Sequence, residues 1–258
     1  MAAAPITRAL LASALLFALS PATGACPPGT IDARVRVEAV YDGDTVRLAD
    51  GRDVRLVGLN TPELNHDEGP DEPLAGAAQR ALRELLASAD HRATLAYGRQ
   101  RHDRYDRVLA HLFLPDGRNV TRLLLERGLG WQVAIPPNLA HRECYARAEA
   151  AARDAGRGVW GHRAHVPVAA DALGPGGGFR LVRGRIGRVG ASKRAYWLDL
   201  GGLTLRLARS DLPYFGRVEP RQWQGRSLLV RGWIYRVDGE ARMNLQHPAA
   251  VEWLDPEP

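Results

Sequence analysis

The stretch VYDGDTVRLADGRDVRLVGLNTPEL, residues 40 to 64, decides the fold expected for the first half of the chain. Residues 45 to 49 and 54 to 59 alternate apolar and polar side chains, as strands with one buried face do. Asp50-Gly51 between them is a strong hairpin signal. Residues 35 to 40 show the same alternation upstream, so we expect three consecutive strands.

Patterns downstream of the hairpin add helices and two more strands. Pro73 precedes apolar residues at helical spacing. Asn119 can cap a short helix that Gly128 ends. The expected elements are a helix at 74 to 89, strands at 93 to 97 and 108 to 114, and helices at 119 to 127 and 140 to 155. This order predicts an α+β arrangement, a small antiparallel barrel with helices packed on it, rather than alternating βαβ units.

The chain has 258 residues, enough for one large domain or two small ones. Residues 1 to 25 hold one Arg, an apolar run too short to span a bilayer, and then small residues, which is typical of a signal peptide cut near Ala25. The glycine-rich stretch ALGPGGGF begins at residue 172 and predicts a linker. We expect a signal peptide (1–25), a first domain (26–171), a linker (172–178) and a C-terminal domain (179–258).

Cys26 and Cys144 are the two cysteines of the chain. In the oxidising compartment that a signal peptide implies, they most simply form one disulfide that ties the N-terminus to a later helix. Lipid attachment at Cys26 is the alternative, but Thr23 fits poorly the Leu-rich signal that lipidation normally uses. We expect an exported protein, periplasmic or secreted, with a lipoprotein as the less favoured form.

The formal net charge of +6 is unevenly distributed. Residues 26 to 175 hold 20 basic and 21 acidic groups, whereas residues 176 to 258 hold 14 basic and 8 acidic groups. A basic surface attracts polyanions through its long-range field and through counterion release. Solubility alone also explains such an excess, and charge does not decide between the two.

The C-terminal segment alternates between an apolar face and a face of Arg and aromatic residues. In residues 227 to 235, Leu228, Val230, Gly232 and Ile234 share one face opposite Leu229, Arg231, Trp233 and Tyr235. Several such strands predict a second, smaller OB-like barrel of five strands. Trp197 and Trp233 among Arg residues suit a single-stranded nucleic acid, because charge holds the backbone and rings stack on bases. The alternative is that the other domain covers both rings.

A second charged stretch, RQRHDRYDRVLAHLF at residues 99 to 113, carries residues that could act together with those of the hairpin. It places Arg107 at the start of a strand, as the hairpin places Arg55 within one, near Asp42, Asp44 and Glu63. Taken singly, these charges are most simply ion pairs on a solvated sheet. Together they supply what phosphodiester hydrolysis needs: oxygen ligands for a hard cation, a carboxylate that takes a proton from water, and guanidinium groups for charge that develops at phosphorus.

The segments YDGDTVRL, VRLVGLNTPE and DRYDRVLAHLF, in this order, resemble the staphylococcal nuclease (thermonuclease) family. The resemblance continues through RLLLERGLGWQV to GVWG and covers roughly residues 33 to 161. It implies an OB-fold barrel with three helices that cleaves DNA and RNA with Ca²⁺. The signal peptide, the linker and the C-terminal domain lie outside it.

The resemblance also implies roles for the matching residues. Arg55 and Arg107 would grip the phosphate and its transition state, and Glu63 would be the general base that orients the attacking water. Tyr105 would contact the nucleotide, with Asp103 and Arg104 as neighbours in the same loop. The metal would be bound by Asp44, by Asn60 and by the backbone carbonyl of Thr61.

Two positions depart from the family pattern. Asn60 stands where the best-studied member has a second metal-binding Asp; its carbonyl can still bind Ca²⁺, but the site loses one negative charge and should be weaker. Asp42 or the segment His66-Asp67-Glu68 could compensate. Ile135 stands where another nucleotide-stacking Tyr is found, so the first domain should bind substrate less well and the C-terminal domain should add affinity.

Four histidines, at 102, 111, 162 and 165, are candidate metal ligands, yet no Cys or carboxylate pattern completes a tetrahedral zinc site. Taken together, the sequence and the Ca²⁺ chemistry that the resemblance implies predict an exported, monomeric, Ca²⁺-dependent nuclease for DNA, RNA or both. The alternative is a nucleic-acid-binding protein that keeps the fold but has lost most turnover. A third possibility is an interaction module of the cell envelope.

Overall fold

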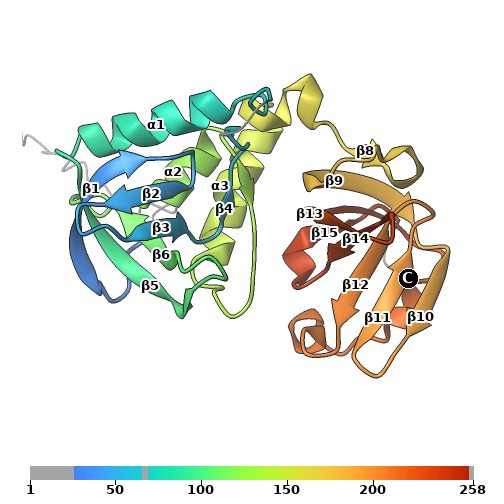
Figure 1. Cartoon of the computed structure of the whole chain (residues 1–258). Helices are drawn as coiled ribbons and strands as arrows, with labels where there is room; N and C mark the ends of the chain where they lie inside the picture. The colour runs from blue at the N-terminus through green and yellow to red at the C-terminus, as the bar shows by residue number, and fades with distance from the viewer. Residues whose placement is uncertain (1–25, 66–68, 256–258) are drawn as a thin grey trace, which may run out of the picture.

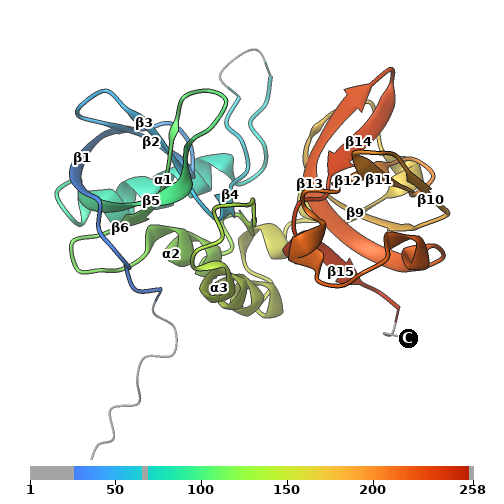
Figure 2. The same cartoon turned by 90° about the horizontal axis from the view of Figure 1, so that it is seen from below.

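The computed structural model describes residues 26 to 65 and 69 to 255. The expected signal peptide and the segment His66-Asp67-Glu68 lie outside the described residues. Two parts lie side by side, an N-terminal barrel with helices and a C-terminal sheet (Figures 1 and 2). Within the described ranges, no helix is both long and apolar enough to cross a membrane.

The N-terminal part is a closed five-stranded barrel in the order β1-β2-β3-β6-β5. The β2–β3 hairpin pairs Thr45 with Arg55, as the alternation and the Asp50-Gly51 turn predict. β3 runs parallel to β6, with Arg55 opposite Leu109, and this pairing closes the barrel. The strands are β1 (Ala33–Val40), β2 (Thr45–Leu48), β3 (Asp53–Leu56), β5 (Arg92–His102) and β6 (Val108–Phe113), and a separate pair is formed by β4 (Leu59–Asn60) and β7 (Trp131–Gln132).

Three helices cover this barrel, α1 (Ala75–Ala87), α2 (Val120–Glu126) and α3 (Arg142–Asp154). Each lies within one or two residues of the range expected from apolar spacing and caps. Asn119 caps α2 by accepting a hydrogen bond from the Arg122 N–H at 2.9 Å, as predicted. The barrel and three helices confirm the expected OB-like fold of the N-terminal part.

The predicted disulfide between Cys26 and Cys144 is present, with the two Cα atoms 5.8 Å apart. It joins the segment before β1 to α3, and both sulfur-bearing side chains lie in the barrel's apolar core. Because this bond uses the Cys26 sulfur, a lipid cannot be attached to that sulfur in the same molecule.

The C-terminal part is one eight-stranded sheet in the order β10-β11-β12-β14-β13-β9-β8, with β15 also paired to β13. Its apolar face buries the alternating residues that the sequence indicates, among them Val182, Leu198 and Val230. The sheet has eight strands rather than five, so a second OB-like barrel stays a prediction. The strands are β8 (Val168–Ala169), β9 (Gly178–Arg185), β10 (Arg188–Ala191), β11 (Ala195–Asp199), β12 (Thr204–Ala208), β13 (Ser227–Val237), β14 (Glu240–Asn244) and β15 (Val251–Trp253).

The two parts are joined by an apolar cluster and by ion pairs. Trp131 and Val159 from the N-terminal part pack with Phe179 and Leu181 of β9. Beside this cluster, Arg231 of β13 donates to both carboxylate oxygens of Glu149 in α3 at 2.7 Å. These contacts hold the C-terminal sheet against the N-terminal part in one orientation.

Candidate active site

The floor of the site is the tight turn before β2. The Asp44 N–H donates to Asp42 Oδ1 at 2.9 Å, and Asp44 is 1% exposed. A Cβ atom at Gly43 would lie 2.6 Å from Ala78 Cβ and 2.7 Å from Thr61 Cγ2, so only glycine lets this turn pack under α1. The turn thus fixes a buried carboxylate at one end of the barrel.

Arg55 projects from β3 onto this carboxylate. One guanidinium nitrogen lies 2.9 Å from Asp44 Oδ2 and 3.1 Å from Asn60 Oδ1. The other terminal nitrogen donates to the Leu59 carbonyl at 2.8 Å. The same nitrogen lies 3.2 Å from the Leu56 carbonyl. With four acceptors and a side chain only 12% exposed, Arg55 has one defined position.

The segment after β4 completes the environment of Asp44. The Thr61 N–H donates to Asp44 Oδ2 at 2.8 Å, and the Thr61 hydroxyl lies 3.2 Å from the same oxygen. Asn60 donates through Nδ2 to the Thr61 carbonyl at 3.3 Å. The three residues predicted to bind metal are therefore in mutual contact.

The charge of Asp44 is only partly compensated. Burial raises its pKa from 3.8 to about 7; Arg55 and the Thr61 N–H oppose this rise, and repulsion from Asp42 and Glu63 adds to it. A cation near these carboxylates would favour the ionised form. The electrostatics of the turn thus suit a bound positive charge.

Glu63 lies in the irregular segment beyond Thr61 and is held through its backbone. Its N–H donates to Glu72 Oε2 at 3.0 Å, and its carbonyl accepts from the Glu72 N–H at 2.9 Å. Glu72 Oε1 in turn lies 3.2 Å from an Arg180 nitrogen on β9. Partial desolvation raises the pKa of the Glu63 carboxyl group, with repulsion from Asp42 adding to it.

The β5–β6 loop supplies the second arginine. Arg107 donates through Nε to Asp103 Oδ2 at 2.8 Å, and its guanidinium group lies 5.4 Å from the centre of the Tyr105 ring. Arg104 donates to the Tyr105 hydroxyl at 2.6 Å. Burial alone would raise the pKa of Asp103, but hydrogen bonds from Arg107 and from the Tyr105 N–H hold it below its usual value.

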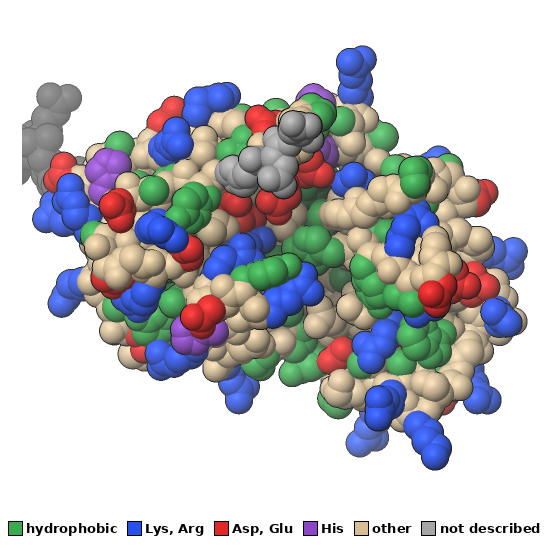
Figure 3. Space-filling view, in the orientation of Figure 1, with side chains coloured by type: hydrophobic (Ala, Val, Ile, Leu, Met, Phe, Trp, Pro, Cys, Tyr) green, Lys and Arg blue, Asp and Glu red, His purple; other side chains and the backbone are tan. Residues whose placement is uncertain are grey.

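These groups open into one cleft of about 1060 Å³ between the two parts of the molecule. Figure 3 shows a hollow at this place in which acidic and basic side chains gather. The predicted site residues that line the cleft are Asp44, Arg55, Asn60, Glu63, Arg104, Tyr105, Arg107 and Trp233. Thr61 does not line the cleft but contacts Asp44. Trp197 is not one of the lining residues; Arg206 and Arg242 lie over its ring, at 5.9 Å and 5.5 Å from the centroid.

Comparison with known proteins agrees with this geometry. A family model described as "Staphylococcal nuclease homologue" matches residues 53–162. The thermonuclease of Staphylococcus intermedius is 34% identical over 127 residues, which are 48% of this chain and 74% of that protein. The chain belongs to the staphylococcal nuclease family.

Two further relatives of about 30% identity have names other than thermonuclease. An uncharacterized endonuclease of Escherichia coli is 30% identical over 142 residues, 53% of this chain and 82% of the relative. The succinoglycan biosynthesis protein ExoI of Rhizobium meliloti (strain 1021) is 29% identical over 136 residues, 51% of this chain and 67% of the relative. The family model ends at residue 162, before β8, so the C-terminal sheet lies outside it.

The atoms around Asp44 that could bind a cation are all oxygens, which suits a hard cation. Asp42, Asp44 and Glu63 are close enough for their charges to repel. Among residues 26–65 and 69–255, no three His, Cys, Asp or Glu side chains form a complete metal site. Backbone and amide carbonyls, from Thr61 and Asn60, would have to supplement the carboxylates.

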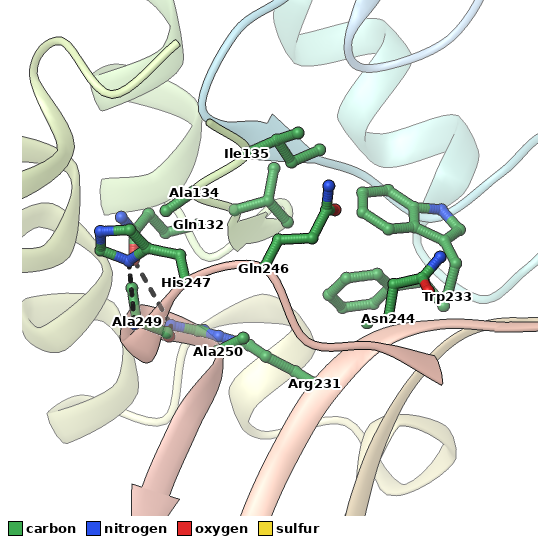
Figure 4. A pocket seen from close by; sticks show the side chains of 13 residues that line it. Gln132, Ala134, Ile135, Arg231, Trp233, Asn244, Gln246, His247, Ala249 and Ala250 are labelled. Atoms are coloured by element: carbon green, nitrogen blue, oxygen red, sulfur yellow. Dashed lines mark hydrogen bonds between the residues drawn. The ribbon is translucent and has the colours of Figure 1, made fainter. Parts of the chain in front are cut away.

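Several residues that line the cleft or support its lining residues were not singled out from the sequence as site residues. Glu72 had no pattern that could have revealed it. Arg206, Tyr235, Asn244 and Gln246 line the cleft from the C-terminal sheet. The alternation in β13 did place Tyr235 on the same face as Trp233, and this pattern could have identified Tyr235 as a cleft residue. In Figure 4, Trp233 and Gln246 point from that sheet toward the side of the cleft that carries Ile135.

Proposed function

We propose that this protein hydrolyses phosphodiester bonds in DNA, RNA or both. The observation that carries the proposal is that Arg55, Arg107 and Glu63 line one cleft over the buried Asp44. Two guanidinium groups and a carboxylate around a space open to solvent can bind a phosphate and activate water beside it. The names of the thermonuclease and endonuclease relatives support the same activity.

In the proposed reaction, Glu63 accepts a proton from water as the water oxygen attacks phosphorus. One P–O ester bond breaks, and the leaving oxygen keeps its electron pair and takes a proton from solvent. The raised pKa of its carboxyl group makes Glu63 a stronger base than an unperturbed carboxylate. Arg55 and Arg107 stabilise the negative charge that accumulates on the phosphoryl oxygens. Since Arg55 is fixed by Asp44, Asn60 and Leu59, it needs no reorganisation when that charge develops.

We propose Ca²⁺ as the cofactor, held by Asp44, Asn60 and the carbonyl of Thr61, with Asp42 beside them. When bound, the cation would polarise the phosphate and lower the pKa of water. The all-oxygen donor set and the only partly compensated charge of Asp44 support this assignment. Changing Asn60 to Asp should tighten Ca²⁺ binding in a calorimetric titration, because the site gains a negative charge; unchanged affinity would contradict the assignment.

We propose further that the protein is exported, periplasmic or secreted, and that it has two domains. The disulfide supports an oxidising compartment. Because β8 pairs with β9, and Ala170 packs in the core of the C-terminal sheet, we propose that the C-terminal domain begins near Val168 rather than after the glycine-rich linker.

The test is cleavage of denatured DNA by residues 26 to 258 across a Ca²⁺ titration. Glu63→Gln should lower the rate by orders of magnitude, whereas Glu84→Gln, which changes an exposed carboxylate on α1, should leave it unchanged. Binding of DNA without cleavage at any Ca²⁺ concentration would favour the alternative, a binding protein with the nuclease fold. Equal rates for Glu63→Gln and wild type would exclude Glu63 as the base.

A further inference from the structure

The wall of the cleft opposite the catalytic groups belongs to the C-terminal sheet. Arg206 of β12 lies opposite Asn244 of β14, and Trp233 of β13 lies opposite Phe179 of β9. Directly opposed residues share one face of a sheet. Tyr235, two residues from Trp233, lies opposite Arg242, two residues from Asn244, so all four side chains project to the same side. Three of them, Arg206, Asn244 and Trp233, line the same cleft as Arg55 and Glu63.

Trp233 is a fixed aromatic surface rather than a loose side chain. Its ring meets Phe179 edge-on with centroids 5.0 Å apart, and Phe179 lies 5.1 Å from Trp131 of the N-terminal part. Trp131 and Phe179 are buried, whereas Trp233 is 38% exposed. The row of three rings therefore anchors an exposed indole at the junction of the two parts and holds it toward the cleft.

The surroundings of Trp233 supply what a nucleobase requires. Ile135, 40% exposed, lines the cleft from the N-terminal part and offers an apolar surface across from the indole (Figure 4). Asn244 and Gln246 carry amides that can donate to and accept from a base edge. The Gln246 amide makes no hydrogen bond to another residue within the described part of the chain, and Arg206 adds positive charge beside these amides.

We propose that Trp233 and Ile135 form the two sides of a base-binding slot, with Asn244 and Gln246 at the base edge and Arg206 at a neighbouring phosphate. This inference rests on the proposed nuclease function and names its substrate as single-stranded nucleic acid. In a duplex, base faces are stacked and base edges are paired, so only an unpaired base can enter such a slot. The scissile phosphate must also reach Arg55, which lines the same cleft.

The test measures binding without cleavage, so that it does not depend on turnover. Residues 26 to 258 are titrated in EDTA against a fluorescein-labelled single-stranded 12-mer and the same sequence as a duplex, with fluorescence anisotropy as the readout. Wild type should prefer the single strand. Trp233→Ala should weaken single-strand binding by roughly 5- to 150-fold, the range found when an aromatic residue that stacks on a base is replaced by alanine.

Two variants keep the result interpretable. Trp233→Phe retains a ring and should recover most of the affinity. Circular dichroism checks that Trp233→Ala is folded. If it is folded, a purely structural role of Trp233 would not explain weaker binding by the alanine variant and its recovery in the phenylalanine variant. Tyr214→Ala removes a ring that is equally exposed, at 39%, but does not line the cleft, so its affinity should match wild type. Equal affinity of Trp233→Ala and wild type, or equal affinity of wild type for single strand and duplex, would overturn the proposal.

Turnover is tested separately with bis(p-nitrophenyl) phosphate, a phosphodiester without bases. If wild type binds the single strand through Trp233 but hydrolyses neither this diester nor DNA, the nuclease proposal fails and the base slot stands. If wild type hydrolyses the diester but Trp233→Ala binds as wild type does, the nuclease proposal stands and the base slot fails.

Discussion

Replacing Arg231 by Leu should cost far more stability than breaking an exposed ion pair between the same two parts. The Arg231 and Glu149 side chains are 17% and 9% exposed, and the Glu149 carboxylate accepts two 2.7 Å hydrogen bonds from Arg231. Without Arg231, the Gln132 N–H at 2.6 Å would be the one remaining hydrogen-bond donor to this carboxylate among the described residues. Removal of one partner from a buried pair costs about 3–5 kcal/mol.

The matched control is Arg153→Gln. Arg153 and Glu252 also join α3 to the C-terminal sheet, at 2.6 Å, but both side chains are 47% exposed. An exposed pair contributes about 0–1 kcal/mol because water and salt screen it. Urea denaturation followed by tryptophan fluorescence gives the free energy of unfolding of each variant.

A double variant, Arg231→Leu with Glu149→Leu, tests the physical reason. This variant removes the buried, unpaired Glu149 carboxylate as well as the ion pair, so it should be more stable than Arg231→Leu alone. A loss below about 1 kcal/mol for Arg231→Leu, similar to that for Arg153→Gln, would refute the reasoning that burial sets the value of this contact. It would mean that the apolar cluster alone holds the two parts together.

Three further predictions concern the disulfide, a buried histidine and the support of the candidate base. Cys144→Ser opens a disulfide that spans 118 residues, and the chain-entropy relation predicts a loss of about 5 kcal/mol in the free energy of unfolding, measurable by urea denaturation. Burial, with repulsion from His141, lowers the pKa of His111 from 6.5 to about 3. Between these two pH values the unfolded chain binds a proton at His111 that the folded protein does not bind. The free energy of unfolding therefore falls as the pH falls. His111→Gln should flatten that fall by up to about 1.4 kcal/mol per pH unit between pH 6 and 4, and parallel curves for variant and wild type would contradict the assignment. Arg180→Gln removes the ion pair that holds Glu72 and should lower kcat on DNA more than Arg183→Gln, which changes an exposed arginine of the same strand; equal rates would exclude a supporting role for Arg180.

Much of the barrel could be predicted because its signals are local. Alternation and Asp50-Gly51 located the β2–β3 hairpin, and Asn119 located the start of α2. β5 extends to His102, beyond the expected end at residue 97, because its pairing with β6 continues past Tyr97 with an irregular register. Such pairing depends on the partner strand, which local propensity does not reveal.

The candidate site divides in the same way. The residues of the hairpin and of the β5–β6 loop were predicted from their motifs and their resemblance to a family, and the structure brings Arg55, Glu63 and Arg107 to one cleft. Glu72 was missed because its role follows from a backbone contact with Glu63 and an ion pair to Arg180, which lies 108 residues further along the chain.

The sequence by itself determined which residue types were available: the acids and arginines of the barrel, the two cysteines and a basic, aromatic C-terminal face. Only the tertiary structure decided which of them meet. Trp197 and Trp233 occupy equivalent positions in alternating strands, yet Trp233 lines the cleft and Trp197 lies under two arginines. Period-two alternation puts both rings on one face of the sheet, since Trp197 lies opposite Arg206 and Arg206 opposite Asn244. The physical reason for the difference is that the packing of Phe179 and Leu181 against Trp131, together with the Arg231–Glu149 pair, brings β9 and β13 against the N-terminal part, whereas β11 lies further along the sheet.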